Sequence, residues 1–138
     1  MNIALISDEN KQELMVQFCI AYCGILAKHT ICATSTTGRM VAEATGLKVQ
    51  RFLSHDQGGC QQIGARIAYN ELDMIFFFTG PDNDAYLDDL KYICHLCDIN
   101  NVPVATNICT AEMLIQGLNR GDLDWREMMY PRTKNVLA

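Results

Sequence analysis

The sequence lacks any apolar run that approaches the about 18 residues of a membrane span, and it has no excess of basic charge. Lysine and arginine together number 11 against 16 aspartates and glutamates, a formal net charge of −5. This balance argues against a surface for nucleic acid or for an anionic membrane. Internal repeats, low-complexity tracts and linkers are also absent, so residues 1–138 are expected to form one domain.

The pattern of a secreted protein is missing as well. Met1 and Asn2 lead directly into an apolar segment with no basic region before it. The seven cysteines are odd in number and lie mainly within apolar stretches, unlike those of a disulfide scaffold. We therefore expect a cytoplasmic protein. Hydrophobic residues make up 49% of the chain and charged residues 20%, which excludes disorder, collagen and coiled coil.

Short apolar segments alternate with amphipathic ones along the whole chain. The apolar segments are residues 3–6, 31–33, 49–53, 74–78 and 104–106. Several are apolar at consecutive positions, which predicts parallel strands buried on both faces. Gln50 and Arg51 interrupt the third segment and favour an edge strand. Because parallel crossovers are right-handed and place helices on both faces, this order predicts a three-layer α/β/α sandwich.

Apolar residues at helical spacing predict five helices, one after each strand. The stripes cover residues 14–26, 40–44, 63–68, 86–97 and 113–118. Asp8 or Asn10 is a candidate cap for the first helix, and Gly46 is typical of the end of the second. The tail from Arg120 onward shows no clear period.

Ligands of open α/β sheets bind beyond the carboxyl ends of the strands, and the segments that follow these strands are polar and small. Residues 34–37 offer four hydroxyls at the expected start of a helix, where free amides and the helix dipole attract an anion. Gly58 and Gly59 offer a second set of amides, and Lys11 offers a positive charge. Each feature alone is equally typical of a cap or turn. Their convergence at one sheet edge favours an anion site.

Motifs in these loops resemble those of the methylglyoxal synthase family over nearly the full length of the chain. The family pattern Thr-Gly-Thr-Thr-Gly is similar to residues 34–38, and Gly-Gly-Asp-Gln-Gln-x-Gly-Ala is similar to residues 58–65. Pro-Val-Ala-Thr-Asn is present at residues 103–107, and the start of the first family helix resembles residues 8–11. The resemblance implies a five-stranded parallel sheet of order 3-2-1-4-5. It also implies a lyase without cofactor or metal, commonly a homohexamer, that converts glycerone phosphate to methylglyoxal and phosphate.

The resemblance also implies site residues. Contacts to phosphate or substrate fall on Lys11, Thr34, Ser35, Thr36, Thr37 and Ser54, and on His55, which stands where the family has glycine. Catalytic positions of the family fall on Asp8, Cys60 and Asp89. Cys60 stands at the position of the family's aspartate base, and Tyr86 falls near its donor histidine. Gly80 and Ser7 stand where the family has a further aspartate and histidine.

Removing a proton beside a carbonyl needs a base and a neutral donor for the developing oxyanion. His55 and Asp56 are candidate replacements, because both lie in the loop that leads to Cys60. A thiolate at Cys60 is a further hypothesis, although a buried, inert cysteine is the simpler interpretation.

Two functions therefore stay open: a lyase of the methylglyoxal synthase type, or a catalytically silent sensor of phosphate or a phosphorylated metabolite. Two other features suggest ligands. Cys94 and Cys97 have the spacing of a metal or redox pair, but they fall within a helical stripe, which favours core packing. Arg132 in the tail is a further candidate for contact with a phosphate.

Overall fold

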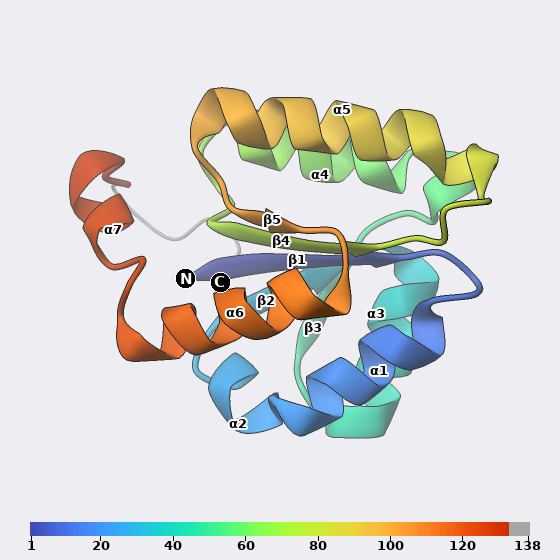
Figure 1. Ribbon diagram of the computed structural model, residues 1–138, viewed down its shortest axis with the longest axis horizontal. Coiled ribbons are helices and arrows are strands. Elements are labelled where there is room, and N and C mark those ends of the chain that lie inside the picture. The colour runs from blue at the N-terminus through green and yellow to red at the C-terminus, as the bar shows by residue number, and fades with distance from the viewer. Residues whose placement is uncertain (133–138) are drawn as a thin grey trace.

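The centre of the protein is a five-stranded parallel sheet in the order β3-β2-β1-β4-β5 (Figure 1). The computed structural model describes residues 1–132. The strands are β1 (Asn2–Ser7), β2 (Thr30–Ala33), β3 (Val49–Arg51), β4 (Met74–Phe78) and β5 (Val104–Ala105). The α/β/α sandwich and its predicted strand order are confirmed, and β3 lies at the edge as expected.

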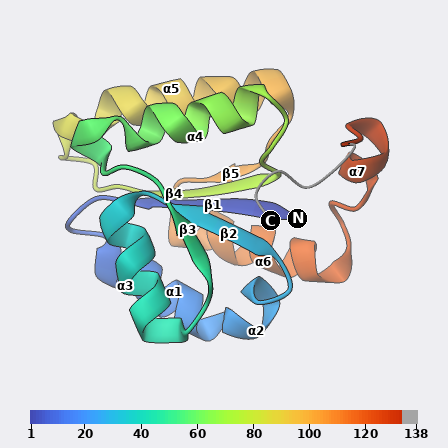
Figure 2. The same cartoon turned by 180° about the vertical axis from the view of Figure 1, so that it is seen from behind.

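Helices cover both faces of this sheet, as Figure 2 shows from the opposite side. One face carries α4 (Gly59–Ala68) and α5 (Asp84–Asn100), and the other carries α1 (Gln12–Ala21), α2 (Cys23–Leu26), α3 (Ser35–Thr45) and α6 (Ile108–Arg120). A 3₁₀ turn, η1 (His55–Gln57), precedes α4, and α7 (Trp125–Met129) follows α6. No helix within residues 1–132 has both the length and the hydropathy to cross a membrane.

The apolar strands divide the core into two layers. Ile3 and Leu5 of β1 pack with α1, α3 and α6, whereas Ala4 and Ile6 pack with α4 and α5. Successive side chains of a strand point to opposite faces, so a strand covered on both sides has to be apolar at every position. The continuous apolar run of β4 has the same cause, since all of its residues are buried.

The region after β1 departs from the prediction in two ways. The stripe over residues 14–26 forms two helices, because Tyr22 (φ −112°, ψ 23°) leaves helical geometry between α1 and α2. Neither Asp8 nor Asn10 caps α1, which begins after Lys11 without a side-chain cap. The carboxylate of Asp8 bonds instead to the segment that follows β4. The end of α3 is confirmed, with Gly46 at φ 75°.

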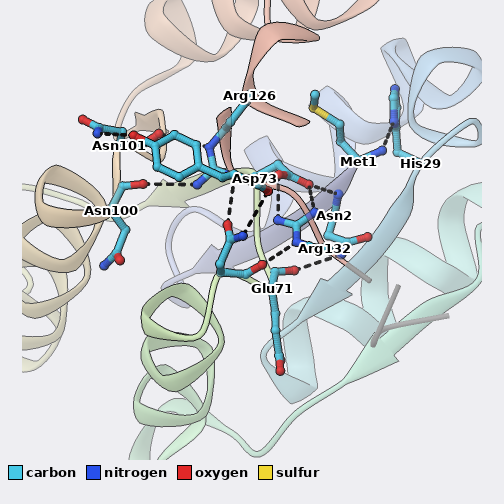
Figure 3. Close-up of polar contacts among 11 residues, drawn as sticks. Met1, Asn2, His29, Glu71, Asp73, Asn100, Asn101, Arg126 and Arg132 are labelled. Carbon is cyan, nitrogen blue, oxygen red and sulfur yellow. Dashed lines mark hydrogen bonds and ion pairs between the residues drawn. The ribbon is translucent and has the colours of Figure 1, made fainter. Parts of the chain in front are cut away.

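The tail is held by Asp73, which directly precedes β4 (Figure 3). Its Oδ1 accepts hydrogen bonds from Arg126 Nη1 at 2.7 Å and from Arg132 Nη2 at 2.8 Å. Its Oδ2 accepts from the Asn2 amide at 2.8 Å and from Arg132 Nη1 at 3.0 Å. Asp73 therefore joins β1, the start of β4 and the segment around α7.

The two arginines also determine the ionisation of Asp73. Burial by itself raises the pKa of this carboxyl, but the bonds from Arg132 and the Asn2 amide, with the charges of both arginines, hold it below its ordinary value. Because this cluster lies at the amino-terminal ends of the strands, Arg132 does not reach the opposite edge of its own sheet. The prediction that Arg132 contacts a phosphate is therefore wrong for a phosphate bound at the carboxyl ends of the strands of the same chain.

Replacing Asp73 by Asn is expected to lower the free energy of unfolding by about 3 kcal/mol, because Arg126 stays buried without its anionic partner. The side chains of Asp73 and Arg126 are each 1% exposed. The matched control is Asp122→Asn. Asp122 forms an ion pair with Arg120, and the side chains of Arg120 and Asp122 are 64% and 58% exposed. This control should lose less than about 1 kcal/mol in urea titrations. Equal losses would contradict the assigned role of Asp73.

Candidate functional site

A cleft of about 450 Å³ opens at the carboxyl ends of the strands. It lies where the strand order reverses, since the chain leaves β3 at one edge and returns to β4 beside β1. Its volume is within the range of small-molecule sites. The cleft is lined by Ser7, Glu9, Gln12, Thr34, Thr36, Thr37, Ser54, His55, Asp56, Ala85 and Tyr86.

The start of α3 forms one wall of the cleft. Thr34 is the N-cap residue of α3 and has an extended backbone conformation (φ −62°, ψ 157°). Its side chain makes no capping hydrogen bond to the first turn of the helix. The amides of Thr36 and Thr37 therefore have no partner within the helix. Thr37 Oγ1 lies 2.8 Å from Ser7 Oγ, which ties this helix start to the end of β1. Free amides and hydroxyls at a helix start suit an anion.

The loop between β3 and α4 forms a second wall, and its glycines are required by geometry. Gly58 has φ 100°, a left-handed conformation that disfavours other residues. A Cβ on Gly59 would overlap the carbonyl oxygen of Leu53. Ser54 Oγ donates to Asp56 Oδ1 at 2.7 Å, and this bond holds the pKa of the exposed Asp56 carboxyl below its ordinary value. The tight loop brings His55 against α5.

His55 lies between a ring and a carboxylate. Its imidazole stacks on Tyr86 with ring centroids 3.7 Å apart and an interplanar angle of 14°. Its Nδ1 lies 2.6 Å from Asp89 Oδ2. The two atoms are close, but Nδ1 makes no hydrogen bond of acceptable geometry with any described residue. Asp89 Oδ1 accepts a hydrogen bond from Gln61 Nε2 at 3.1 Å. His55 thus joins the cleft to Asp89.

Cys60 lies in the first turn of α4 and is fully buried. Burial, with the charge and hydrogen bond of Asp89, raises the pKa of its thiol to about 12. A thiol with this pKa is neutral at neutral pH, which disfavours the thiolate hypothesis. Burial, with the negative charge of Glu9 as a further cause, also raises the pKa of Tyr86. Neither Cys60 nor Asp89 is among the residues that line the cleft.

Asp8 is also fully buried and lies outside the cleft lining. Its Oδ2 accepts from Thr79 Oγ1 at 2.8 Å and from the Gly80 amide at 2.7 Å, and its Oδ1 accepts from the Asn10 amide at 2.8 Å. Burial by itself raises the pKa of Asp8, but these bonds outweigh it and lower the pKa. In this conformation the Asp8 carboxylate links the end of β1 to the segment that follows β4.

The structure separates the predicted site residues into three groups. Thr34, Thr36, Thr37, Ser54 and His55 share the cleft. Lys11 and Ser35 do not line it, although each is next in sequence to a lining residue, and Ser35 Oγ accepts a hydrogen bond from Arg51 at 3.3 Å. Asp8, Cys60 and Asp89 lie outside the lining, and Asp89 contacts His55.

Sequence reasoning missed three of the lining residues, Glu9, Gln12 and Ala85. Glu9 and Gln12 flank Lys11 at the start of α1, and this proximity was an available signal. Ala85 carried no signal, because an alanine offers no chemistry. It enters the cleft only because it directly precedes Tyr86 in the first turn of α5.

The fold and the cleft together define a doubly wound α/β protein with a cleft of small-molecule size at the switch point of its sheet. A family model described as an MGS-like domain matches residues 15–106. The chain therefore belongs to the methylglyoxal synthase-like family.

Close relatives and a solved structure are similar over most of the chain. A protein of Caldicellulosiruptor saccharolyticus named methylglyoxal synthase is 56% identical over 133 residues, covering 96% of this chain and 94% of that protein. A protein of Geobacillus thermodenitrificans with the same name is 49% identical over 136 residues, covering 98% and 94%. The crystal structure of methylglyoxal synthase from Elizabethkingia anophelis NUHP1 is similar with a TM-score of 0.77 and 34% identity. That match covers 83% of this chain and 76% of the other.

The burial and raised pKa of Cys60 predict low reactivity toward iodoacetamide. At neutral pH in the folded protein we expect Cys60 to be alkylated at least about 100-fold more slowly than the exposed Cys109, because only a thiolate attacks. Peptide mass spectrometry over a time course gives both rates, and a urea-unfolded sample is the control in which the two rates should converge. Fast labelling of Cys60 in the folded protein would restore the thiolate hypothesis.

Proposed function

We propose that the protein binds a small phosphorylated metabolite with its phosphate at the start of α3, and that it converts glycerone phosphate to methylglyoxal and phosphate. The observation that carries the proposal is the cleft itself, which Thr34, Thr36 and Thr37 line together with His55. The names of the relatives support the choice of substrate and reaction.

The phosphate half of the proposal depends on the helix start. The amides of α3 that have no helical partner and the dipole of the helix attract a phosphate, and the exposed Thr36 hydroxyl is placed to donate to one of its oxygens. Within residues 1–132, the cleft lining contains Glu9 and Asp56 but no lysine or arginine. Formal positive charge comes from beside the cleft, from Lys11 next to Gln12 and from Arg51, which already contacts Ser35. The acidic residues favour a ligand that keeps its charge at the α3 end.

The lyase half depends on His55. The reaction removes a proton from the carbon beside the carbonyl, forms an ene-diolate and then breaks the bond to the phosphate oxygen, which leaves with the electron pair. Asp89 lies at Nδ1 of His55, so the opposite ring nitrogen, Nε2, is left to exchange a proton with the substrate. Asp56 is less suited, because it is exposed and already accepts the Ser54 hydroxyl. His55 is therefore our choice for the group that replaces a carboxylate base.

The second candidate function is a silent sensor that uses the same cleft for phosphate or a phosphorylated metabolite. Two observations favour it: the Cys60 thiol is buried and neutral, and the Asp8 carboxylate already accepts three hydrogen bonds. Neither group is free to take a proton from a substrate in this conformation.

We further infer that the protein is a cytoplasmic homo-oligomer, and the family resemblance points to a hexamer. All seven cysteines are free, which suits a reducing compartment. Trp125, Met128 and Met129 of α7 are exposed, which suits a surface covered by another copy of the chain.

Phosphate binding is tested at Thr36, which is exposed, so that its loss leaves the core intact. Inorganic phosphate should raise the melting temperature of the protein, because it binds only the folded state. Thr36→Ala should weaken phosphate binding about tenfold, the effect of one lost hydrogen bond to a charged group. Thr36→Ser should restore most of it. Thr110→Ala, in the first turn of α6 and outside the cleft lining, is the matched control. Unchanged stabilisation in Thr36→Ala would refute the phosphate site.

The lyase reaction is tested by supplying glycerone phosphate and trapping methylglyoxal with a dicarbonyl reagent. His55→Gln should lower kcat by about 10² to 10⁴, the usual effect of losing a positioned proton-transfer group, with little change in phosphate binding. The control is His95→Gln, an exposed histidine within α5. A wild-type rate at background removes the lyase and leaves the phosphate site. Activity that appears only in Cys60→Asp identifies the natural protein as the silent sensor.

A further inference from the structure

Three side chains of different chemistry converge beside the cleft. His55 Nδ1, Cys60 Sγ and a carboxylate oxygen of Asp89 all lie within 4.8 Å of one another. They come from η1, α4 and α5, so the packing of α4 against α5 assembles the group. This separation is small enough for one ion to contact all three after modest side-chain rotation, since metal–ligand bonds of about 2.0–2.3 Å place ligands close together.

The His55 nitrogen is the second observation. Nδ1 is buried and makes no hydrogen bond of acceptable geometry with any described residue, although it lies 2.6 Å from Asp89 Oδ2. Buried ring nitrogens almost always find a partner, so one that is aimed at a carboxylate without a proper hydrogen bond needs an explanation. A cation that both groups bind provides one, once the two side chains move slightly apart to the spacing of ligands on one ion.

We propose that His55, Cys60 and Asp89 form a binding site for a divalent transition metal, with zinc as the ion of best fit. An imidazole, a thiol and a carboxylate are the three ligand types that Zn²⁺ takes in proteins, whereas Mg²⁺ and Ca²⁺ take oxygen ligands. Coordination displaces the thiol proton to solvent and leaves one tetrahedral position for water or for an oxygen of a cleft ligand.

Neighbouring residues hold these ligands in place. Gln61 Nε2 donates to Asp89 Oδ1 at 3.1 Å, which leaves Oδ2 facing His55. The stacked ring of Tyr86 fixes the plane of the imidazole. Such outer contacts orient metal ligands and affect affinity. They argue for a built site rather than a chance cluster.

The metal site does not depend on the proposed function. A metal at Nδ1 takes the lone pair of that nitrogen and leaves the proton on Nε2, so metal-bound His55 donates to a cleft ligand and does not act as a base. Phosphate binding at the start of α3 is compatible with both states, whereas the base role of His55 belongs to the metal-free protein. The first test therefore uses a spectroscopic signal rather than activity, and the phosphate-dependent melting shift is measured in parallel with and without metal. If the spectroscopic signal of the metal is absent and the phosphate-dependent melting shift is present, only the metal site fails. The reverse result overturns only the phosphate site.

The test titrates the full-length, reduced protein with Co²⁺, a coloured substitute for Zn²⁺. We expect visible bands of tetrahedral Co²⁺, a near-ultraviolet thiolate-to-cobalt band, and loss of both when Zn²⁺ is added. Cys60→Ser should remove the thiolate band. Cys109→Ser is the matched control, because Cys109 is exposed and is the most accessible competing thiol.

Two further variants keep the test decisive if Cys60→Ser fails to fold, which circular dichroism reports. Asp89→Asn keeps the thiol and should weaken Co²⁺ binding while the thiolate band persists at saturation. Gln61→Ala should weaken binding about tenfold with an unchanged spectrum, as expected for an outer contact. The absence of tetrahedral bands in the wild-type protein overturns the proposal, and so does a thiolate band that disappears in Cys109→Ser but not in Cys60→Ser.

Discussion

The parallel pairing of β1 with both β2 and β4 is the constraint on which the rest of the protein depends. Because all strands run in the same direction, their carboxyl ends meet at one edge, and α3, α4 and α5 all begin there. Asp8 holds that edge together, since its carboxylate binds the segment after β4. Loops far apart in the chain thus become neighbours around one cleft.

The polar contacts differ between the two ends of the parallel strands, called here the amino-terminal edge and the carboxyl edge of the sheet. At the amino-terminal edge, Asp73 joins two arginines and the Asn2 amide, and all of the strong polar contacts there are between parts of the protein itself. At the carboxyl edge, the amides at the start of α3 have no helical partner, and the exposed Thr36 lines the cleft beside the buried hydroxyls of Thr34 and Thr37. Closed polar contacts stabilise a fold, whereas open ones are available to a ligand.

The site itself has two layers. Hydroxyls and a helix start form the outer layer, where the chemistry suits a phosphate. His55, Cys60 and Asp89 form the inner layer, with His55 as the residue that belongs to both. The family resemblance predicted the residues of the outer layer, and it identified the replaced catalytic positions one at a time. The structure adds that three residues from different elements of the chain gather beside one another.

Alternation of apolar and amphipathic segments was sufficient to predict the layers and the loops at the strand ends, whereas the strand order came from the family resemblance. That pattern is local, and crossover handedness leaves few ways to assemble it. The bonds of Asp8 to the segment after β4, which leave α1 without a side-chain cap, and the partner of Arg132 were not predictable, because each joins residues distant in sequence. The same holds for His55: its loop was recognisable from residues 54–59, but its contact with Asp89 exists only because α4 and α5 pack side by side.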